Sequence, residues 1–347
     1  MDEKIRFGMV GAGHIAQSYA QAFDGCARAQ LAAVADVRAE AARALAEGFG
    51  CRSYDAYEAM AEGEALDAVV VCTPPVTHSE VCLYFLDRQI HVLCEKPFSV
   101  DVESARAMVE ASQEAGVYLT MASKFRYVED VTRARSIVES GILGEIVLFE
   151  NAFTSRVDMS SRWNSNPQIS GGGVLIDNGT HSVDLMRYFL GPLVEVRVVE
   201  GKRIQGLSVE ETVRIHAHSA SGALGSIDLS WSINKEQDSY INIYGSEGTV
   251  SVGWRESKYR QASGRDWAVF GGGYDKVGAF RSQVDNFARA ICGEEALRIT
   301  AEDAVASVEA VQAAYTALSQ NQWTPISQAP VVLKGANRHL KVVSDLV

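Results

Sequence analysis

The sequence predicts an α/β protein with two domains: a doubly wound parallel sheet over residues 1–123, and an α+β domain with an open, mainly antiparallel sheet over residues 124–347. In the first part, short apolar runs alternate with helical stretches, which is typical of βαβ units and a parallel sheet. In the second part, long segments alternate polar and apolar residues, which indicates antiparallel strands with one covered face. A length of 347 residues agrees with two domains.

The strands of the first domain are almost entirely apolar, as a sheet covered on both faces requires. The stretches HIAQSYAQAF and RAEAARALAEGF between them have helical character, and the second ends before Gly50. The predicted strands are 5–10 (IRFGMV), 31–36 (LAAVAD), 68–72 (AVVVC), 90–94 (IHVLC) and 117–122 (VYLTMA).

The second domain opens with a predicted helix at 133–140 that ends at Gly141, and helices return at 279–292 and 301–320. Hairpin turns are predicted near Gly222 and at 245–248, because strand patterns flank both places. Because the strands of 194–254 leave one sheet face to cover, the sequence predicts a homo-oligomer. The alternating segments are 145–153, 194–204, 211–233 and 239–254, and residues beyond 327 carry less pattern.

The formal net charge of −12 argues against nonspecific nucleic-acid binding, because that binding depends on neutralising phosphates. The six cysteines show neither a C-x-x-C motif nor metal-ligand spacing, so they are interpreted as reduced thiols. The start MDEKIRFG lacks the apolar stretch of a signal peptide, and no run approaches about 18 apolar residues. We therefore expect a cytoplasmic protein with no nucleic-acid or membrane partner.

The segment VGAGHIA, at the end of the first strand, carries a G-x-G-x-x-A pattern at Gly11, Gly13 and Ala16. Gly11 permits a tight turn, Gly13 lets the backbone approach a pyrophosphate, and Ala16 allows close packing of helix and strand. The N-terminus of the following helix offers N–H groups and a partial positive charge to phosphates. We predict a dinucleotide site here; the alternative interpretation is a tight turn with no ligand.

Asp36 ends the second strand, 25 positions after Gly11, where a carboxylate accepts hydrogen bonds from the adenine-ribose hydroxyls. A carboxylate there repels a 2′-phosphate, so NAD is favoured over NADP. Arg38 is a reservation, since it would meet a 2′-phosphate if Asp36 turned away; otherwise it is a solvated residue at a helix start. The neighbouring residues predicted to contact the cofactor are His14, Ile15 and Val37.

Two more segments follow strands at the carboxyl edge of the sheet, where ligands of open α/β sheets bind. In CTPPVTHSE (72–80), Thr73 and Pro74 are predicted to line the cofactor, and His78 is either a cofactor residue or a helix-start residue without a ligand. In CEKP (94–97), Glu95 joins the cofactor set, and Lys96 is placed where nicotinamide and substrate would meet. The alternative for Lys96 is pairing with a carboxylate at the strand end.

Residues 171–184, GGGVLIDNGTHSVD, begin with three glycines, which allow a ligand or another backbone to come close. At helical spacing the next polar residues span only about 60° of one helix face, opposite an apolar anchor of Val183, Met186 and Leu190. These polar residues are Asp177, His181 and Asp184. A carboxylate beside a histidine orients the imidazole for proton transfer. The alternatives are a solvent-facing helix or a metal site, although no other ligand cluster supports a metal.

Together these motifs resemble the Gfo/Idh/MocA family of NAD(P)-dependent oxidoreductases. The resemblance implies an N-terminal Rossmann domain and a C-terminal domain that binds the substrate, with an open antiparallel sheet whose free face makes dimer or tetramer contacts. The matching segments are VGAGHIA, CTPPVTH, CEKPFS, SGILGEI (140–146), GGGVLIDNGTHSVDL and YGSEGTV, in the family's order over about residues 5–320.

The resemblance also implies roles for individual residues. Lys96 matches the active-site lysine, and Asp177 and His181 match the D-x-x-x-H pair of inositol-dehydrogenase-like members. Asp184 matches a position that often contacts a substrate hydroxyl. Where many members read N-x-R-F, this chain has SKFRY, with Lys124 in the first place, which argues against a plain neutral polyol as substrate.

We expect a sugar or cyclitol dehydrogenase or ketoreductase that passes a hydride between nicotinamide C4 and a ring carbinol carbon. His181, oriented by Asp177, exchanges the hydroxyl proton, and Lys96 stabilises the negative charge that develops on the oxygen; an alternative assignment exchanges the roles of His181 and Lys96. Two other functions stay open: an NAD-dependent glycosidase that oxidises its substrate transiently, and a non-catalytic dinucleotide-sensing regulator. Retention of the three residues argues against the regulator.

Four cations predict an anionic or nucleotide-linked sugar as the substrate. In a chain of net charge −12 they form a local reversal of sign, and arginine suits bidentate pairing with phosphate or carboxylate. They are Lys124 and Arg126 after the last strand of the first domain, and Arg156 and Arg162 before the three glycines, with Trp163 available to stack on a sugar or base. The alternative is surface pairing with Glu129, Asp130 and Asp158.

Overall fold

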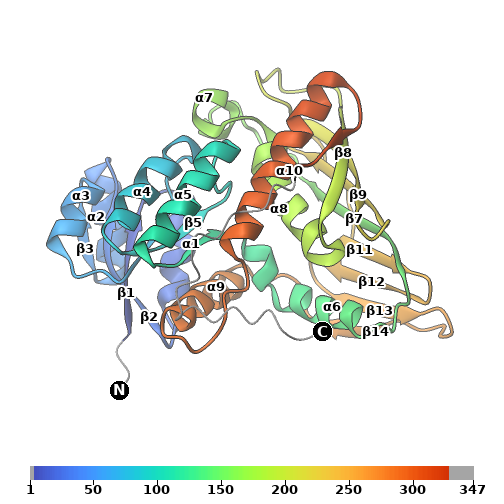
Figure 1. Cartoon of the computed structure of the whole chain (residues 1–347), viewed down its shortest axis with the longest axis horizontal. Helices are drawn as coiled ribbons and strands as arrows, with labels where there is room; N and C mark the ends of the chain where they lie inside the picture. Colours follow the sequence, from blue (N-terminus) through green and yellow to red (C-terminus); the bar gives the residue numbers. More distant parts are fainter. Residues whose placement is uncertain (1–3, 328–347) are drawn as a thin grey trace. The chain divides into compact units, whose positions relative to one another are not determined.

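Figure 1 shows the computed structural model of the chain, which describes residues 4–327. These residues divide into two compact units: the first comprises 4–124 and 276–305, and the second comprises 125–275 and 306–327. Among the described residues, none of the helices combines the length and the apolar character that crossing a membrane requires.

The first unit is built on a parallel sheet of six strands in the order β3-β2-β1-β4-β5-β6. The strand order reverses between β1 and β4, which makes their carboxyl ends the switch point where ligands of such sheets bind. The strands are β1 (Ile5–Val10), β2 (Ala29–Ala35), β3 (Arg52–Tyr54), β4 (Ala68–Val71), β5 (His91–Glu95) and β6 (Leu119–Ala122).

Helices cover both faces of this sheet. They are α1 (His14–Phe23), α2 (Ala39–Phe49), α3 (Tyr57–Gly63), α4 (His78–Asp87), α5 (Val102–Ala115) and α9 (Lys276–Ile291). On β1, Phe7 lies in a core shared with α1 and α9, whereas a Cβ on Gly8 would meet Met60 of α3 at 2.8 Å on the other face. Helix α9 belongs to this core because Phe280 contacts Tyr19 of α1, with ring centroids 4.5 Å apart.

The second unit is built on a sheet of nine strands in the order β14-β13-β12-β11-β7-β10-β9-β8-β15. Only the pairing of β10 with β7 is parallel among the pairs described; the others are antiparallel. The strands are β7 (Ile146–Thr154), β8 (Leu193–Glu200), β9 (Thr212–Ser219), β10 (Leu224–Ser230), β11 (Ser239–Gly245), β12 (Gly248–Gly253), β13 (Ser257–Gln261), β14 (Ala268–Gly271) and β15 (Thr324–Pro325).

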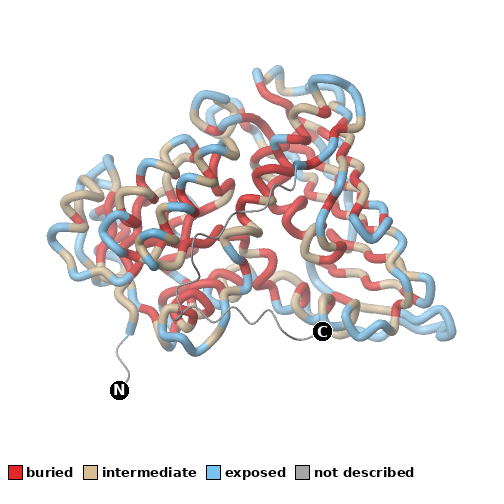
Figure 2. Tube along the Cα trace, viewed as in Figure 1, coloured by how far each residue is buried: buried red, intermediate tan, exposed pale blue. Residues whose placement is uncertain are grey.

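One face of this second sheet is covered by α8 (Val174–Leu190), which contacts β7, β9 and β10. Along β9, Val213 and Ile215 are buried toward the helix, while Arg214 and His216, which alternate with them, stay accessible. Figure 2 shows this alternation of burial along the strands. The remaining helices are α6 (Glu129–Glu139), α7 (Pro167–Ser170) and α10 (Ala301–Gln320), the last of which begins within residues of the first unit.

The predicted fold class is confirmed: a doubly wound parallel sheet and a mixed, mostly antiparallel sheet. The two predicted hairpins are present as β9–β10, whose turn holds Gly222 at φ +88°, and as β11–β12. One segment is grouped differently from the predicted domain division at residue 123. The domain division itself stays a prediction. Residues 276–305 join the first unit by their contacts, because α9 packs on α1. The weakly patterned segment beyond 327 lies outside the described residues.

Candidate active site

The turn between β1 and α1 requires glycine at its first position and leaves its third position open. Gly11 has φ +99°, and a Cβ there would lie 2.7 Å from the carbonyl oxygen of Cys72. Gly13 immediately precedes α1, and a Cβ there would meet no described atom within 4 Å. The N-cap residue of this helix is Gly13, which has no side chain to cap the first N–H groups. The turn therefore fits a pyrophosphate at the N-terminus of α1.

Asp36 follows β2 at the same edge, and the backbone fixes its carboxylate. Oδ2 accepts a hydrogen bond of 2.7 Å from the Ala12 N–H, and Oδ1 accepts one of 2.8 Å from the Arg38 N–H. Burial raises the pKa of Asp36, but these bonds and the Arg38 side chain outweigh burial, so the pKa lies below its ordinary value. Asp36 is therefore ionised at neutral pH. Of the neighbours, His14 and Val37 are exposed and Ile15 is half-buried.

His78 is a buried histidine that joins two loops of this edge. Its Nδ1 lies 2.8 Å from the carbonyl oxygen of Pro97, and its Nε2 lies 2.9 Å from that of Thr73. Burial lowers the pKa of His78, whereas the backbone carbonyls around it raise the pKa. Because both ring nitrogens face backbone, the structure favours the interpretation of His78 as a helix-start residue of α4. Thr73 and Pro74 are half-buried beside it.

Glu95 and Lys96 stand at the carboxyl end of β5. Glu95 is buried, and its Oε2 accepts a hydrogen bond of 3.2 Å from the N–H of Lys96, whose side chain is half-buried. Burial raises the pKa of Glu95, and the charges of Lys96 and Lys124 partly oppose this shift. The carboxylate that the alternative interpretation of Lys96 requires is therefore present. The charges of both Lys96 and Lys124 act on this Glu95 carboxylate. The Lys96–Pro97 peptide bond next to it is cis.

The space left by the missing side chains of Gly172 and Gly173, before α8, is filled by other residues of the protein. A Cβ on Gly172 would lie 1.9 Å from the hydroxyl of Tyr315, and one on Gly173 would lie 2.2 Å from the carbonyl oxygen of Glu210. The Glu210 carboxylate accepts hydrogen bonds from the N–H groups of Gly173 and Leu175 at 2.9 and 3.1 Å. This buried carboxylate therefore neutralises the positive end of α8, which holds the helix in place.

Asp177 and His181 lie one turn apart on α8, and the neighbourhood of His181 is aromatic. His181 is 5% exposed and meets the ring of Phe125 edge to face, with centroids 5.0 Å apart. Phe125 in turn stacks on Phe153 at 4.7 Å and on Tyr274 at 5.3 Å. This packing fixes the imidazole and rules out the interpretation of α8 as a solvent-facing helix. Within residues 4–327, no group of three or more His, Cys, Asp or Glu is placed to hold a metal ion.

Arg126 and Asp184, both predicted to bind substrate, bind each other. Nε and Nη2 of Arg126 donate hydrogen bonds of 3.0 and 2.5 Å to the two oxygens of Asp184. The side chains are 5% and 0% exposed, and the guanidinium also lies over the ring of Tyr188 at 5.1 Å. The carboxylate partner of Arg126 is thus Asp184 rather than the surface acids considered above. Substrate binding by either residue stays a prediction.

Breaking this pair is expected to destabilise the protein. Asp184→Ala leaves the Arg126 charge buried beside an apolar side chain, so the free energy of unfolding should fall by about 3–5 kcal/mol. Urea unfolding followed by circular dichroism measures this change. As a control, Glu129→Ala removes the exposed partner of Arg133 and should cost less than about 1 kcal/mol. Equal effects of the two substitutions would contradict the assignment of a buried, mutually dependent pair.

The other predicted cations have different neighbours. Lys124 is half-buried, with its Nζ 5.7 Å from the ring centroid of Phe280. Arg156 and Arg162 are exposed in the segment between β7 and α7, and Trp163 is 45% exposed. Hydrogen bonds from Ser160, and then the charge of Arg162, lower the pKa of Asp158. Arg162 therefore has a carboxylate nearby, in line with the alternative of surface pairing.

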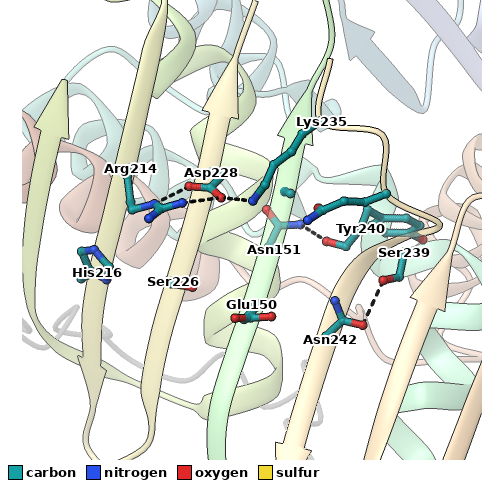
Figure 3. A pocket seen from close by; sticks show the side chains of 12 residues that line it. Glu150, Asn151, Arg214, His216, Ser226, Asp228, Lys235, Ser239, Tyr240 and Asn242 are labelled. Carbon is teal, nitrogen blue, oxygen red and sulfur yellow. Dashed lines mark hydrogen bonds and ion pairs between the residues drawn. The ribbon is translucent and has the colours of Figure 1, made fainter. Parts of the chain in front are cut away.

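The free face of the second sheet carries a polar pocket that the sequence did not single out (Figure 3). Its volume is about 190 Å³. Arg214 donates hydrogen bonds of 2.6 and 3.0 Å to Asp228, and the ammonium group of Lys235 pairs with the same carboxylate. His216 and Glu150 line the pocket beside this group (Figure 3). The charges come from three chain segments, so only the folded sheet brings them together.

Two family models match the chain. The one described as "Oxidoreductase family, NAD-binding Rossmann fold" matches residues 5–123, and the GFO/IDH/MocA C-terminal domain matches residues 131–251. The chain belongs to the GFO/IDH/MocA family of oxidoreductases. The cofactor of this family's Rossmann domain is NAD, and the open position at Gly13 and the ionised Asp36 fit that cofactor.

Relatives and solved structures agree with this membership. Inositol 2-dehydrogenase of Rhizobium meliloti (strain 1021) is 31% identical over 259 residues, which cover 72% of this chain and 75% of that protein. The rhizopine catabolism protein MocA of Rhizobium meliloti is 27% identical over 92% of this chain and 96% of its own length. A structure of levoglucosan dehydrogenase with NADH and levoglucosan has a TM-score of 0.88 at 20% identity, covering 94% of this chain and 100% of that one, which establishes the fold alone.

Cofactor preference is expected to depend on Asp36. NAD should bind more tightly than NADP, and Asp36→Ala should narrow the difference, because it removes the acceptor for the ribose hydroxyls and the charge that repels a 2′-phosphate. Loss of hydrogen bonds to a charged group predicts about a 10- to 100-fold weaker binding of NAD. Calorimetric titration with both cofactors measures this. Tighter binding of NADP to the unaltered protein would assign the adenine-ribose site to Arg38 instead.

Proposed function

We propose that the protein oxidises a ring hydroxyl of a sugar, sugar derivative or cyclitol, or reduces the corresponding ketone, with NAD. The observation that carries the proposal is that Lys96, Asp177 and His181 are all retained in a chain 31% identical to an inositol 2-dehydrogenase. The rigid setting of His181 against Phe125 supports it, since proton transfer requires a fixed base. NAD, when bound, accepts or returns the hydride at nicotinamide C4.

His181 takes the proton of the reacting hydroxyl during oxidation and returns it during reduction. Asp177, one helical turn earlier, orients the imidazole and stabilises its charged form. The T-shaped contact with Phe125 restricts the ring, so little reorientation is needed at the moment of transfer. Proton transfer by a positioned side chain contributes about 10²- to 10⁴-fold to the rate.

Lys96 donates a hydrogen bond to the reacting oxygen and stabilises the negative charge that develops there. Its position supports this role, because it leaves the carboxyl end of β5, two strands away from the glycine turn of β1 in the same sheet. The mechanism requires Lys96 and His181 to act on one oxygen. If the two residues exchange roles, the lysine transfers the proton and the histidine stabilises the oxygen.

A screen for cofactor turnover tests the proposal. The protein with NAD is incubated with a panel of pyranoses, glycosides and cyclitols while the absorbance of the reduced nicotinamide is followed. The proposal expects net formation of NADH with at least one of them, in proportion to the ketone formed. Release of a free sugar with no net NADH would identify the glycosidase, and NAD binding without any turnover across the panel would favour the regulator.

The finer part of the proposal is that the substrate carries an anionic or nucleotide group. Because Asp184 already engages Arg126, this part rests on Lys124 and Arg162, with Trp163 beside the latter. The test compares kcat/KM for a neutral sugar and for its phosphorylated, carboxylated and nucleotide-linked forms. Lys124→Ala and Arg162→Ala should lower kcat/KM for the charged forms selectively. Arg265 is an exposed arginine outside the predicted site, and Arg265→Ala serves as the control that should show no such selectivity. Preference for the neutral sugar, with no selective effect of either variant, would refute this part.

We also propose that a second copy of the chain covers the free face of the second sheet. Large apolar side chains on this side stay accessible: Val199 is 49% exposed, Ile233 is 48% exposed, and both line a hollow of about 480 Å³. Exposed apolar area of this kind marks interaction sites. Light scattering at micromolar concentration is expected to give a dimer or tetramer, and Ile233→Asp should shift it toward the single chain. A single-chain mass for the unaltered protein would contradict the proposal.

A further inference from the structure

Three buried side chains of the first unit form a hydrogen-bonded chain that ends beside Lys96. The Nε2 group of Gln283, on α9, donates to the hydroxyl of Tyr19, on α1, at 2.8 Å. That hydroxyl donates to Oε1 of Glu95, at the end of β5, also at 2.8 Å. Gln283 and Tyr19 are 0% exposed and Glu95 is 6% exposed. Water therefore cannot readily replace any of the three groups.

The chemistry of the groups fixes the direction of this chain. An ionised carboxylate only accepts, so the single proton of the Tyr19 hydroxyl points at Glu95. The amide of Gln283 must then donate to the Tyr19 oxygen through its NH₂ group. Its own Oε1 is buried and has no hydrogen-bond partner among residues 4–327, so the only hydrogen bond described for the Gln283 side chain is the one to Tyr19. The other oxygen of Glu95 accepts from the Lys96 N–H.

The charged and titratable groups facing Glu95 come from several elements. Lys96 follows β5 itself, and Lys124 stands at the start of η2 (Lys124–Tyr127), after β6; both favour the ionised form of Glu95. The other groups near it are thiols and the phenol. For Cys72, Cys94 and Tyr19, burial raises the pKa, and the charge of Glu95 raises each further. Glu95 is thus a buried negative charge supported by one phenolic hydroxyl, the Lys96 N–H and the charges of two lysines.

We propose that Tyr19 and Gln283 are positioning residues for Lys96: by donating along the chain to Glu95, they hold in place the carboxylate that accepts the Lys96 N–H, and they keep its negative charge beside the lysine. This inference rests on the proposed function for the role of Lys96, but not for the chain of hydrogen bonds itself. Neither residue touches the reacting atoms. They act through Glu95, and they tie the cofactor helix α1 and the later helix α9 to the lysine.

The sign of the effect follows from coupled titration. Tyr19→Phe removes the hydrogen bond that favours ionised Glu95, so the pKa of Glu95 rises further above its ordinary value. Hydrogen bonds to charged groups predict a shift of about one pH unit or more. Once Glu95 is protonated, it no longer places a negative charge beside Lys96, so the activity that depends on this arrangement is lost as pH falls through the pKa of Glu95. In the variant, the acid limb of the kcat/KM profile therefore moves to higher pH.

The direct test follows Glu95 by carbon NMR in the full-length protein labelled at its glutamate side chains, with Glu95→Gln to assign the signal. Tyr19→Phe is expected to move the titration midpoint of Glu95 upward by about one pH unit or more. Gln283→Met, which leaves the phenol in place without its donor, should move it in the same direction by less. Lys96→Met should also raise the midpoint, because the charge of Lys96 favours the ionised form of Glu95.

A matched control removes a tyrosine–glutamate bond elsewhere. Tyr244 donates to Glu150 at 3.0 Å in the second unit, so Tyr244→Phe should leave the Glu95 midpoint in place. A purely structural role of Tyr19 would lower the melting temperature without moving the midpoint, and that result overturns the inference. If Tyr19→Phe does not fold, an unchanged midpoint in Gln283→Met overturns it instead.

The titration needs no substrate, so its outcome is separable from that of the proposed function. Midpoints that move as expected support the inference even if no sugar in the panel reduces NAD, in which case only the proposed function fails. With a substrate that is turned over, the acid limb of kcat/KM should move by the same amount as the Glu95 midpoint. A kinetic profile that stays in place while the midpoint moves would overturn the inference, because the ionised form of Glu95 would then not matter to the action of Lys96.

Discussion

Lys96→Ala is expected to lower kcat by about 10²- to 10³-fold while leaving the affinity for NADH nearly unchanged. The expected loss is that of a single charged donor aimed at an oxygen that gains negative charge in the transition state. The affinity should survive because the residues predicted to hold the pyrophosphate and adenine ribose, in the glycine turn, in α1 and at Asp36, lie at other strands of the sheet. Steady-state kinetics and quenching of protein fluorescence by NADH measure the two quantities.

The matched control for this experiment is Lys258→Ala, which removes a lysine that pairs with Glu256 on the edge of the second sheet. It should leave kcat within about twofold, because Lys258 lies at the surface and is not among the predicted site residues. A kcat for Lys96→Ala close to that of the unaltered protein would mean that Lys96 contributes to neither proton transfer nor charge stabilisation. A large loss of NADH affinity would instead assign Lys96 to cofactor binding.

His181→Ala is expected to lower kcat by about 10²- to 10⁴-fold, the range for loss of a positioned acid–base group. Because His181 is buried against Phe125, the alanine leaves a hollow of imidazole shape, and added imidazole should restore part of the activity. Asp177→Asn keeps the shape of the carboxylate but not its charge, so kcat should fall by less. Kinetics at several pH values, with and without imidazole, measure these effects.

His218→Ala provides the comparison for His181. His218 lies on the free face of the second sheet, where its Nδ1 is 2.8 Å from Glu195. Its loss should change kcat little, and added imidazole should have no effect on it. If His181→Ala retained near-normal kcat, or if imidazole stimulated both variants equally, His181 would not be the proton-transfer residue.

Much of the fold could be predicted from local sequence patterns. For the features that were not predicted, the reason can be identified. The apolar run IRFGMV predicted β1 at its observed bounds, Ile5–Val10, because a strand buried on both faces needs no alternation. Strand β3 (RSY) escaped prediction because it is three residues long, mainly polar, and paired only with β2. The grouping of α9 also escaped prediction, since amphipathic spacing shows that a helix has a core face but not which core it joins.

Some features of the candidate site could likewise be predicted from the sequence, and others could not. The positions of Gly11, Asp36 and Lys96 were predictable, because each follows a parallel strand and so falls at one edge of the sheet. The engagement of Arg126 by Asp184 was not, because 58 positions separate the partners and no local motif couples them. The same holds for the chain of Gln283, Tyr19 and Glu95, whose members come from three elements of the first unit.

The central claim is that hydride passes between a ring carbinol carbon and NAD. The most direct measurement uses a substrate from the screen that carries deuterium at the reacting carbon, with mass spectrometry of the nicotinamide product. The account predicts one deuterium per NADH at nicotinamide C4, with a ketone formed in equal amount and both lost together in His181→Ala. Reduced cofactor without deuterium, or a released sugar with the cofactor left oxidised, would contradict it.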